Sequence, residues 1–376
     1  MNGLPLKHTG SRPAATGLDP DQAPRVWILL ATGAGDNRQL LNLASALGWP
    51  WEIKQAVDSL PRVLADRLRT SGRDRVPHRK GDQLCPPWPD VILMSGGRCV
   101  IDAMRIRAES GGRSKVVCLG RPWAPLAWFD LVVSTPQYRL PDHPNVLQTL
   151  LPLNRMDPDT GAAAARAWEP RLSHLPRPWL GVLLGGSSGS YRFTTDAARV
   201  LGRRVDARAR ATGSALLISS SARTPGKVLD ALLESVQVPY YCYHWHPDDI
   251  DNPLEAILAL SDEFVVTADS ASMLAEACAT GRPVMTFVPP LRWRARLLTR
   301  SWLPDGAGRA GWLTLRHRLV SRGLWVPARD MSRVHEALAA CGAVQPLPAT
   351  AVPRPVQATP DDMDRVVVSI KALLRS

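Results

Sequence analysis

The residues best suited to chemistry lie where an apolar run gives way to a helical pattern in the second half of the chain. Phe264 to Val266 predict a buried strand, and the chain then continues through Asp269 and Ser270, small polar residues that can cap a helix. The residues after them favour a helix, which Gly281 can end. A strand that turns directly into a helix points free N–H groups and the positive end of a dipole at an anion.

Glu276 adds a second element to this pattern, because it lies about two turns inside the predicted helix. It is too far from the helix start to meet a phosphate, but it is within reach of a ribose hydroxyl held beside it. Ser270 and Ser272 can donate to the phosphate itself. The arrangement suits a sugar nucleotide. The alternative is an ordinary strand–helix unit that Asp269 or the serines cap.

A glycine-bearing loop follows the strand predicted over 179–184. Gly185 and Gly186 have no Cβ, so their backbone N–H groups can approach a pyrophosphate closely. Ser187 and Ser188 come next, and polar residues at this point favour a ligand over a simple turn. The alternative is that the glycines only form a turn.

A third loop, 221–225, follows the strand predicted over 215–218 and carries a single cation, Arg223. A helix is expected to begin here, so the guanidinium and the helix dipole would converge on one anion. Ser221 and Thr224 flank the arginine and are further candidates. The alternative is a surface arginine that pairs with an acid.

Up to about Val288 the chain alternates apolar, strand-like runs with helical patterns, and from Arg292 onward the pattern is less regular. The runs do not alternate strictly between polar and apolar residues, which is typical of parallel sheets covered by helices on both faces. Strands are predicted over 26–30, 91–94, 115–119, 129–133, 179–184, 215–218, 240–245, 264–266 and 284–288. The predicted fold class is therefore α/β, with two Rossmann-like domains that face each other across a cleft.

Composition sets the predicted domain boundaries. Residues 1–24, rich in Gly, Pro and polar side chains, are predicted to be a disordered arm, and an N-terminal domain follows over 25–153. Between 154 and 178 the sequence shifts to Asp, Pro, Ala and Arg, which predicts a linker with one short helix over 162–168. A second domain is predicted over 179–345, followed by a tail over 346–376 that ends in an amphipathic helix.

The charge of the chain is unusual. Its 376 residues carry a formal net charge of +12, and 46 basic residues include only six lysines, which leaves 46 − 6 = 40 arginines. Such a surplus favours anionic partners, but no nucleic-acid-binding signature is present, so we expect no nucleic acid partner. Thirteen tryptophans against four phenylalanines favour an anionic lipid surface, above all in the basic stretch 292–325. Packing of the tryptophans in two cores is the alternative.

The sequence also bears on location and on metals. No window approaches the ~18 apolar residues of a membrane span, and the first 24 residues lack an apolar signal segment. We therefore expect a cytoplasmic protein that is peripheral on the inner face of the cytoplasmic membrane. Cys242, His244 and His246 alternate along one predicted strand, but no fourth metal ligand accompanies them. We expect neither a metal nor a cofactor.

These loops, in this order, resemble those of the mitochondrial-fission (elongated-mitochondria) family, whose bacterial members are described as nucleotide-sugar glycosyltransferases. The resemblance runs from about Val26 to Pro290. It rests on the loops 185–188, 221–225 and 269–276, on Asn252-Pro253, and on Gly35 to Gln39. It implies a glycosyltransferase-B fold and makes Asn252 a further candidate ligand, although Asn252-Pro253 also has the pattern of a helix cap.

One further likeness supports this resemblance, and two positions depart from the pattern of the related proteins. The segment 270–289 is similar to the donor-site helix of the N-acetylglucosaminyl transferase that makes lipid II, in which the acid at the position of Glu276 binds the nucleotide ribose. The family usually has two arginines before Thr-Pro, but Ala222 stands at the first position here, which leaves Arg223 alone. Related enzymes often carry His where this chain has Asp36.

The resemblance also suggests where an acceptor would bind. Glycosyl transfer without a metal needs a base for the acceptor hydroxyl and a stabiliser for the leaving diphosphate. Asp36 is the candidate base, and the alternative is that it caps a helix over 37–47. The other candidates on the acceptor side are Gly35, Asn37, Gln39, Gly97 and Arg98.

Three functions are therefore weighed. The leading one is a glycosyltransferase that moves a sugar from a nucleoside-diphosphate sugar, with a UDP-sugar favoured, to an envelope lipid or saccharide. The second is a sugar-nucleotide epimerase on the same fold. The third is a membrane-associated adaptor without chemistry, because plant members of the family are linked to the recruitment of a fission GTPase. The sequence makes no prediction of the oligomeric state.

Overall fold

The computed structural model describes residues 23–30, 34–55, 84–97, 99–154, 157–187, 190–247, 249, 251–292, 307–327, 329–347 and 362–375. Most of the predicted arm lies outside this set. The chain forms two compact units, and each is described by itself. Unit 1 comprises Met1–Thr149, Leu303–Ala328 and Asp361–Ser376, and unit 2 comprises Leu150–Trp302 and Arg329–Pro360.

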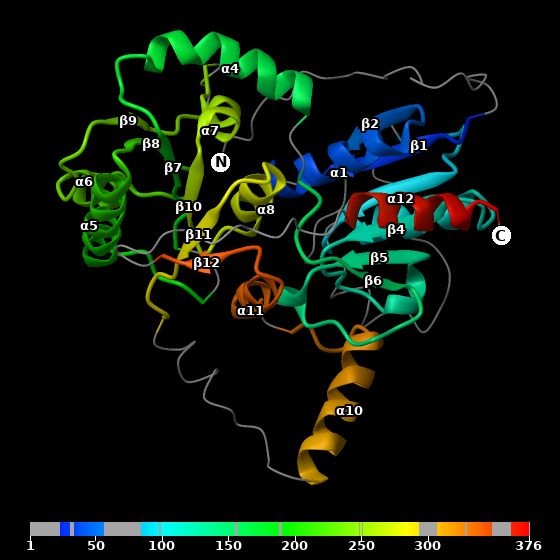
Figure 1. Ribbon diagram of the computed structural model, residues 1–376. Helices are drawn as coiled ribbons and strands as arrows, with labels where there is room; N and C mark the ends of the chain where they lie inside the picture. The colour runs from blue at the N-terminus through cyan, green and yellow to red at the C-terminus, as the bar shows by residue number, and fades with distance from the viewer. Residues whose placement is uncertain are drawn as a thin grey trace. The chain divides into compact units, whose positions relative to one another are not determined.

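Unit 1 is built on a six-stranded parallel sheet with the order β2-β1-β3-β4-β5-β6 (Figure 1). Strands such as β3 are buried along their whole length, because they are apolar on both faces. The strands are β1 (Val26–Leu30), β2 (Trp51–Gln55), β3 (Val91–Ser95), β4 (Lys115–Leu119), β5 (Leu131–Ser134) and β6 (Val146–Gln148). The helices are α1 (Ala34–Leu47), α3 (Val100–Glu109), α10 (Ala307–Ser321) and α12 (Asp362–Leu373), with short 3-10 turns η1 (Leu126–Trp128) and η2 (Pro136–Tyr138).

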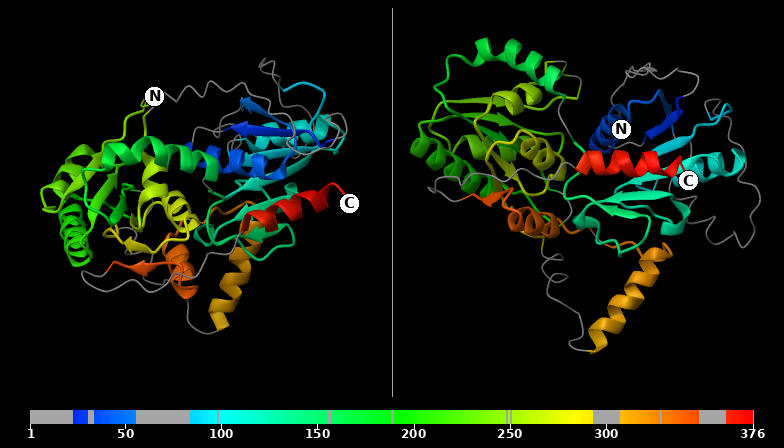
Figure 2. Two further views of the ribbon diagram at one scale, coloured as in Figure 1. Left: turned by 45° about the horizontal axis from the view of Figure 1, so that its top comes forward. Right: turned by 45° about the vertical axis from the view of Figure 1, so that its right-hand side comes forward.

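Unit 2 is built on a second six-stranded parallel sheet with the order β12-β11-β10-β7-β8-β9 (Figures 1 and 2). Counted along the unit, this is the strand order of a Rossmann fold, which reverses direction between β7 and β10. The strands are β7 (Trp179–Leu183), β8 (Ala215–Ser219), β9 (Tyr240–Tyr243), β10 (Glu263–Thr267), β11 (Val284–Phe287) and β12 (Gln345–Pro346). The helices are α4 (Pro158–Leu172), α5 (Thr195–Thr212), α6 (Gly226–Leu233), α7 (Leu254–Leu260), α8 (Ala271–Ala279) and α11 (Ser332–Ala340).

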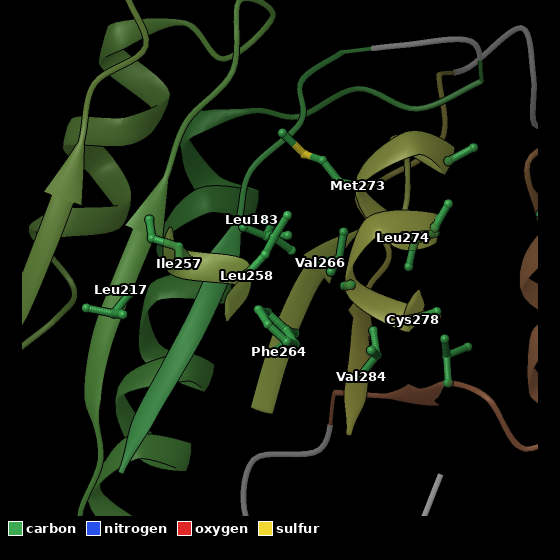
Figure 3. Close-up of a cluster of buried hydrophobic side chains, with 14 of the residues drawn as sticks. Leu183, Leu217, Ile257, Leu258, Phe264, Val266, Met273, Leu274, Cys278 and Val284 are labelled. Carbon is green, nitrogen blue, oxygen red and sulfur yellow. The ribbon is translucent and has the colours of Figure 1, made fainter. Parts of the chain in front are cut away.

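Two apolar cores fill the two faces of the unit 2 sheet. Successive side chains of a strand point to opposite faces, so Leu180 and Val182 of β7 belong to the core shared with α5 and α6. Trp179 and Leu183 belong to the other core, shared with α7 and α8 (Figure 3). This explains why the sequence of β7 shows no polar–apolar alternation. The prediction of an α/β fold with two parallel, Rossmann-like sheets is confirmed.

A buried ion pair fixes the amino end of β10. The side chains of Arg208 in α5 and Glu263 are 3% and 10% exposed. The guanidinium donates two hydrogen bonds to the carboxylate, from Nε to Oε1 at 3.0 Å and from Nη2 to Oε2 at 2.7 Å. Bidentate pairs of this kind are among the strong interactions of proteins. The pair ties α5 to the strand that leads into the predicted ligand-binding loop.

The segment 154–178, which its composition marks as a linker, carries α4. This helix is longer than the short helix expected over 162–168. Trp168 and Leu175 are buried in the core of unit 2, and the rings of Trp168 and Tyr241 lie 5.8 Å apart. The segment therefore packs as part of unit 2.

The last helix of the chain belongs to unit 1. α12 occupies the region where the sequence predicts an amphipathic helix, and its residues Val366 and Ile370 are fully buried. It contacts α1, and the ammonium group of Lys371 lies 5.9 Å from the ring of Trp49. The C-terminal helix thus completes the core of unit 1.

Candidate functional site

The predicted loops of unit 2 converge at the carboxyl edge of its sheet. β7 and β10 are neighbours at the point where the strand order reverses, and such switch points are where doubly wound sheets bind ligands. The loop 184–187 follows β7, the loop 268–270 follows β10, and the loop 220–225 follows the adjacent β8. The sequence therefore identified three loops that the fold brings together. Ser188 lies outside the described residues.

Asp269, in the loop after β10, contacts both of the other loops. Its side chain is fully buried, its Oδ2 accepts a hydrogen bond from the N–H of Gly186 at 2.9 Å, and the guanidinium of Arg223 lies 3.4 Å away. Burial raises the pKa of Asp269, and the Gly186 N–H and the Arg223 charge oppose that rise. In this position Asp269 holds the loops together and is not exposed to solvent.

The two glycines are required for close packing, and their N–H groups are already engaged. The N–H of Gly185 donates to Oγ1 of Thr267 at 2.7 Å, and the N–H of Gly186 donates to Asp269. Both N–H groups thus have acceptors within the protein, and their approach to a pyrophosphate stays a prediction. A Cβ on Gly185 would clash with the Asp269 carboxylate, and one on Gly186 would clash with the carbonyl of Arg223.

Gly186→Ala is expected to lower the free energy of unfolding by about 1–3 kcal/mol, because the added methyl group would force the loops apart. Chemical denaturation measures this difference. Gly226→Ala is the matched control, since a Cβ at Gly226 meets no atom within 4 Å and should leave stability unchanged or slightly higher. If both variants lowered the free energy of unfolding equally, the close approach of the loops would not contribute to stability.

The loop after β8 is shaped by its own hydroxyl groups. Oγ1 of Thr224 donates to the carbonyl of Leu184 at 3.0 Å and accepts from the N–H of Ser221 at 3.0 Å. Oγ of Ser221 accepts from the N–H of Arg223 at 3.3 Å. Ser221 and Thr224 thus hold the turn, whereas the side chain of Arg223 is 41% exposed. Arg223 is the member of this loop that can reach a ligand.

α8 begins at the same edge of the sheet. Ser270 occupies the N-cap position, but its side chain makes no capping hydrogen bond, and Ser272 in the first turn is half-buried. The first N–H groups of a helix have no acceptor within the helix, so those of α8 remain directed at the switch point. Gly281 adopts a positive φ of 72° beyond the end of α8, as the sequence predicts.

Glu276 is the one acidic residue of α8, and it is 6% exposed. The helix starts at Ala271, so Glu276 lies in its second turn, where the sequence places it. Burial of a carboxylate among apolar side chains is costly unless a partner compensates it. Its contact with a ribose stays a prediction.

Asn252 lies just before Pro253, which is the N-cap residue of α7. Oδ1 of Asn252 accepts a hydrogen bond from the N–H of Leu254, the first residue of α7, at 3.0 Å. Within the described residues, Asn252 forms no hydrogen bond with the three loops that meet at the switch point. The pattern Asn252-Pro253 does mark the start of a helix, but the N-cap residue is Pro253.

Sequence reasoning missed two residues near Asp269, the half-buried His335 and the buried Tyr191. Nε2 of His335, in α11, lies 2.7 Å from the carbonyl oxygen of Ala268, and burial lowers the pKa of His335. Burial and the carboxylates of Asp330, Asp269 and Glu336 raise the pKa of Tyr191 to about 12. No local motif marks either residue, because only the tertiary fold brings them to β10.

The acceptor-side candidates of unit 1 also lie at a switch point. β1 stands between β2 and β3, so the strand order reverses between β1 and β3. Gly97 follows β3 and lies so close to Trp123 that a Cβ would clash with the indole ring. The start of α1 follows β1 and contains Gly35, Asp36, Asn37 and Gln39. Arg98 lies outside the described residues.

The start of α1 corrects one expectation. The alternative in which Asp36 caps a helix that begins at Asn37 is wrong, because α1 begins at Ala34 and Asp36 lies in its first turn. Asn37 is buried and Gln39 is half-buried. The side chain of Asp36 falls outside what the structure describes.

The suggested metal ligands do not form a cluster. Cys242 packs against the core of unit 2, and burial raises the pKa of its thiol to about 12. Within the described ranges, no group of three His, Cys, Asp or Glu residues is arranged to hold a metal ion.

Two doubly wound parallel sheets in one chain, each with its candidate loops at a switch point, define an α/β protein with two Rossmann-like units. A model of the family described as Mitochondrial fission ELM1 matches residues 34–307, and the chain belongs to this family. The resemblance seen in the sequence is thereby confirmed.

Proteins similar to the chain include two relatives and a solved structure. Mitochondrial fission protein ELM1 of Arabidopsis thaliana is 29% identical over 219 residues, which cover 52% of this chain and 51% of the plant protein, so the match spans about half of that relative. An uncharacterized protein of Rickettsia prowazekii is 24% identical over 299 residues, which cover 70% of this chain and 83% of that protein. The crystal structure of a glycosyltransferase from Rickettsia africae is 8% identical with a TM-score of 0.45, and covers 94% of this chain and 100% of that chain.

None of the helices that the structure describes is both long enough and apolar enough to cross a membrane.

Proposed function

We propose that unit 2 binds the nucleoside diphosphate of a nucleotide sugar, with uridine favoured, and that the protein transfers the sugar to an envelope lipid or saccharide. The observation that carries this proposal is the position of Arg223. It is an exposed cation in the loop beside the switch point, and among the described residues its ion-pair partner is the buried Asp269, which lies just before the start of α8. A guanidinium and a helix dipole at one edge of a Rossmann sheet suit a diphosphate.

The ion pair between Arg223 and Asp269 supports this role. At 3.4 Å it is longer than a good charge-assisted hydrogen bond, and the arginine side chain is partly in solvent. A diphosphate can therefore take the outer N–H groups of Arg223 while Asp269 keeps the loop in place. Ser187 and Ser272 stand at the same edge as further donors, and Glu276 would accept from a ribose hydroxyl.

The proposed reaction is a direct transfer. The acceptor hydroxyl gives its proton to Asp36 while its oxygen forms a bond to the anomeric carbon of the sugar. The bond from that carbon to the diphosphate oxygen breaks, and the diphosphate leaves with the electron pair. Arg223 and the dipole of α8 stabilise its charge, which is the task that a metal ion performs in other transferases.

We also propose that the protein works at the inner face of the cytoplasmic membrane as a peripheral protein, without a nucleic acid partner. The basic, tryptophan-bearing region after Leu291 supports this location. An envelope lipid would be reached from such a surface.

Arg223→Ala is expected to weaken binding of uridine diphosphate by roughly tenfold or more, because a charge-assisted hydrogen bond to an anion contributes about 1.5–3 kcal/mol. Binding of uridine should change little, since the nucleoside carries no charge for Arg223 to meet. Calorimetry with both ligands measures the two effects. Arg203→Ala, which removes an exposed arginine from the middle of α5, is the control and should affect neither ligand.

The outcome also separates the alternatives. Equal losses for both ligands in Arg223→Ala would mean that the variant disturbs the fold of unit 2, which would overturn the assignment. Absence of binding by wild type in a thermal-shift panel of nucleoside diphosphates would favour the adaptor, since a ligand at 100 times its Kd should stabilise by about 2.7 kcal/mol. Conversion of a nucleotide sugar without any acceptor would favour the epimerase.

A further inference from the structure

The positive charge of the chain is concentrated in one stretch. Residues 292–329 contain nine arginines and one acid, Asp305, so their formal charge is 9 − 1 = +8 of the +12 of the whole chain. The same 38 residues hold four of the 13 tryptophans. Within this stretch the structure describes the side chains of residues 292, 311–327 and 329, most of which belong to α10 and the turn that follows it. α10 itself has no acidic residue.

α10 and its following turn display a group of large apolar side chains. Gly323 adopts a φ of 64° just beyond the end of α10, and the N–H of Trp325 donates to the carbonyl of Leu319 at 3.2 Å, so the chain folds back along the helix. The rings of Trp312 and Trp325 meet edge to face with centroids 5.5 Å apart. Four exposed residues make up what we call the α10 patch: Trp312 (36% exposed), Leu315 (48%), Leu324 (67%) and Trp325 (37%).

The α10 patch is unusual for this chain. Among the described residues, eight large hydrophobic side chains are exposed, and four of them belong to the α10 patch. Single exposed apolar residues are ordinary, but a contiguous group of them marks an interaction surface. Figures 1 and 2 show α10 projecting beyond the sheet of unit 1.

Two hydrogen bonds attach α10 and the segment after it to the rest of unit 1. Arg121, after β4, donates to the carbonyl of Pro327, and Arg316 donates to the carbonyl of Arg139 at 3.1 Å. These two arginines are therefore used within the unit. Arg318 and Arg322 are exposed, and neither forms an ion pair with another described residue. Their charges are available to a partner.

We propose that the α10 patch docks on an anionic lipid bilayer, with its indole and leucine side chains at the depth of the headgroups and Arg318 and Arg322 against the lipid phosphates. Tryptophan settles at this depth because its ring is apolar and its N–H is polar. Arginine adds an attraction that depends on the charge of the lipid. This inference gives the membrane location proposed above a defined surface, and it is independent of nucleotide binding.

Co-sedimentation with vesicles tests the proposal, with phosphatidylcholine alone compared with phosphatidylcholine mixed with phosphatidylglycerol. Wild type should bind the anionic vesicles more tightly. Trp312→Ala/Trp325→Ala should lower that binding roughly tenfold, because two indole rings are no longer transferred from water to the headgroup region of the bilayer. Arg318→Gln/Arg322→Gln should lower it by about as much, and only on the anionic vesicles.

Matched variants separate the surface from general effects. Trp128→Ala removes an exposed tryptophan of η1, and Arg203→Gln/Arg333→Gln removes two exposed arginines elsewhere, so both should bind like wild type. Thermal unfolding, with and without uridine diphosphate, shows whether each variant folds and whether its nucleotide site is intact. Loss of vesicle binding with an unchanged nucleotide shift would place the two properties on different surfaces.

Three results would overturn the proposal. The first is binding by the tryptophan variant equal to that of wild type. The second is equal binding of wild type to both kinds of vesicle. The third is a dimer of wild type on size-exclusion chromatography that the tryptophan variant loses, which would make the α10 patch an interface between two copies of the chain.

Discussion

Arg208→Leu is expected to lower the free energy of unfolding by about 3–5 kcal/mol, the largest effect on stability that the structure indicates. The arginine and its partner Glu263 are both buried, and two hydrogen bonds of 3.0 and 2.7 Å join them. Removal of the guanidinium would leave a carboxylate inside unit 2 with its counter-charge gone. Chemical denaturation at neutral pH gives the value.

A double variant distinguishes the ion pair from the loss of packing. Arg208→Leu/Glu263→Leu should recover most of the stability, because replacing both members of a buried pair by apolar residues is often neutral. Arg199→Leu serves as the exposed comparison, since Arg199 pairs with Asp196 at 3.4 Å and those side chains are 43% and 93% exposed. That change should cost less than about 1 kcal/mol. If Arg208→Leu cost no more than Arg199→Leu, the buried pair would not be a stabilising element.

Glu276→Gln is expected to weaken the binding of uridine diphosphate by about 1.5–3 kcal/mol, or roughly 10-fold to 150-fold. Glutamine keeps the size of the side chain within the second turn of α8 but removes the charge that a ribose hydroxyl would meet. Calorimetry with uridine diphosphate and uridine measures the effect. Both ligands should lose affinity, since both carry the ribose, whereas Arg223→Ala should affect only the diphosphate.

Glu234→Gln is the matched control for this prediction. The Glu234 side chain is 63% exposed at the end of α6, so its variant should bind both ligands like wild type. An unchanged affinity in Glu276→Gln would remove the ribose role and leave Glu276 as a structural carboxylate. An affinity lost together with thermal stability would point to the fold of α8 instead.

Much of the fold could be predicted because parallel strands leave a clear mark on the sequence. Strands β3, β8 and β10 each contain an apolar run, and each ends in a small polar residue at the edge where such folds bind ligands. α4 was underestimated, because the polar composition around it concealed the spacing of Trp168, Leu172 and Leu175, which all enter the core. β6 and β12 are too short to stand out in the sequence.

The candidate site was only partly predictable, for a different reason. A sequence shows that glycines occur at 185 and 186, but it does not show that Thr267 and Asp269 accept their N–H hydrogen bonds. It identifies Asp269 as polar, but not as a fully buried link between three loops. His335 reaches the carbonyl of Ala268 from 67 residues further along the chain, and no local pattern predicts such a contact.

The division of the chain between the units has a consequence for biosynthesis. Unit 1 begins the sequence, yet it also contains Leu303–Ala328 and Asp361–Ser376, whereas the last segment of unit 2 ends at Pro360. On the ribosome, the sheet of unit 1 is therefore translated first, but α12, whose Val366 and Ile370 are buried, is translated only after all of unit 2. Unit 2 can complete its core earlier. The unit whose strands are translated first is thus completed after the other, and the apolar surface that α12 covers stays exposed in the meantime.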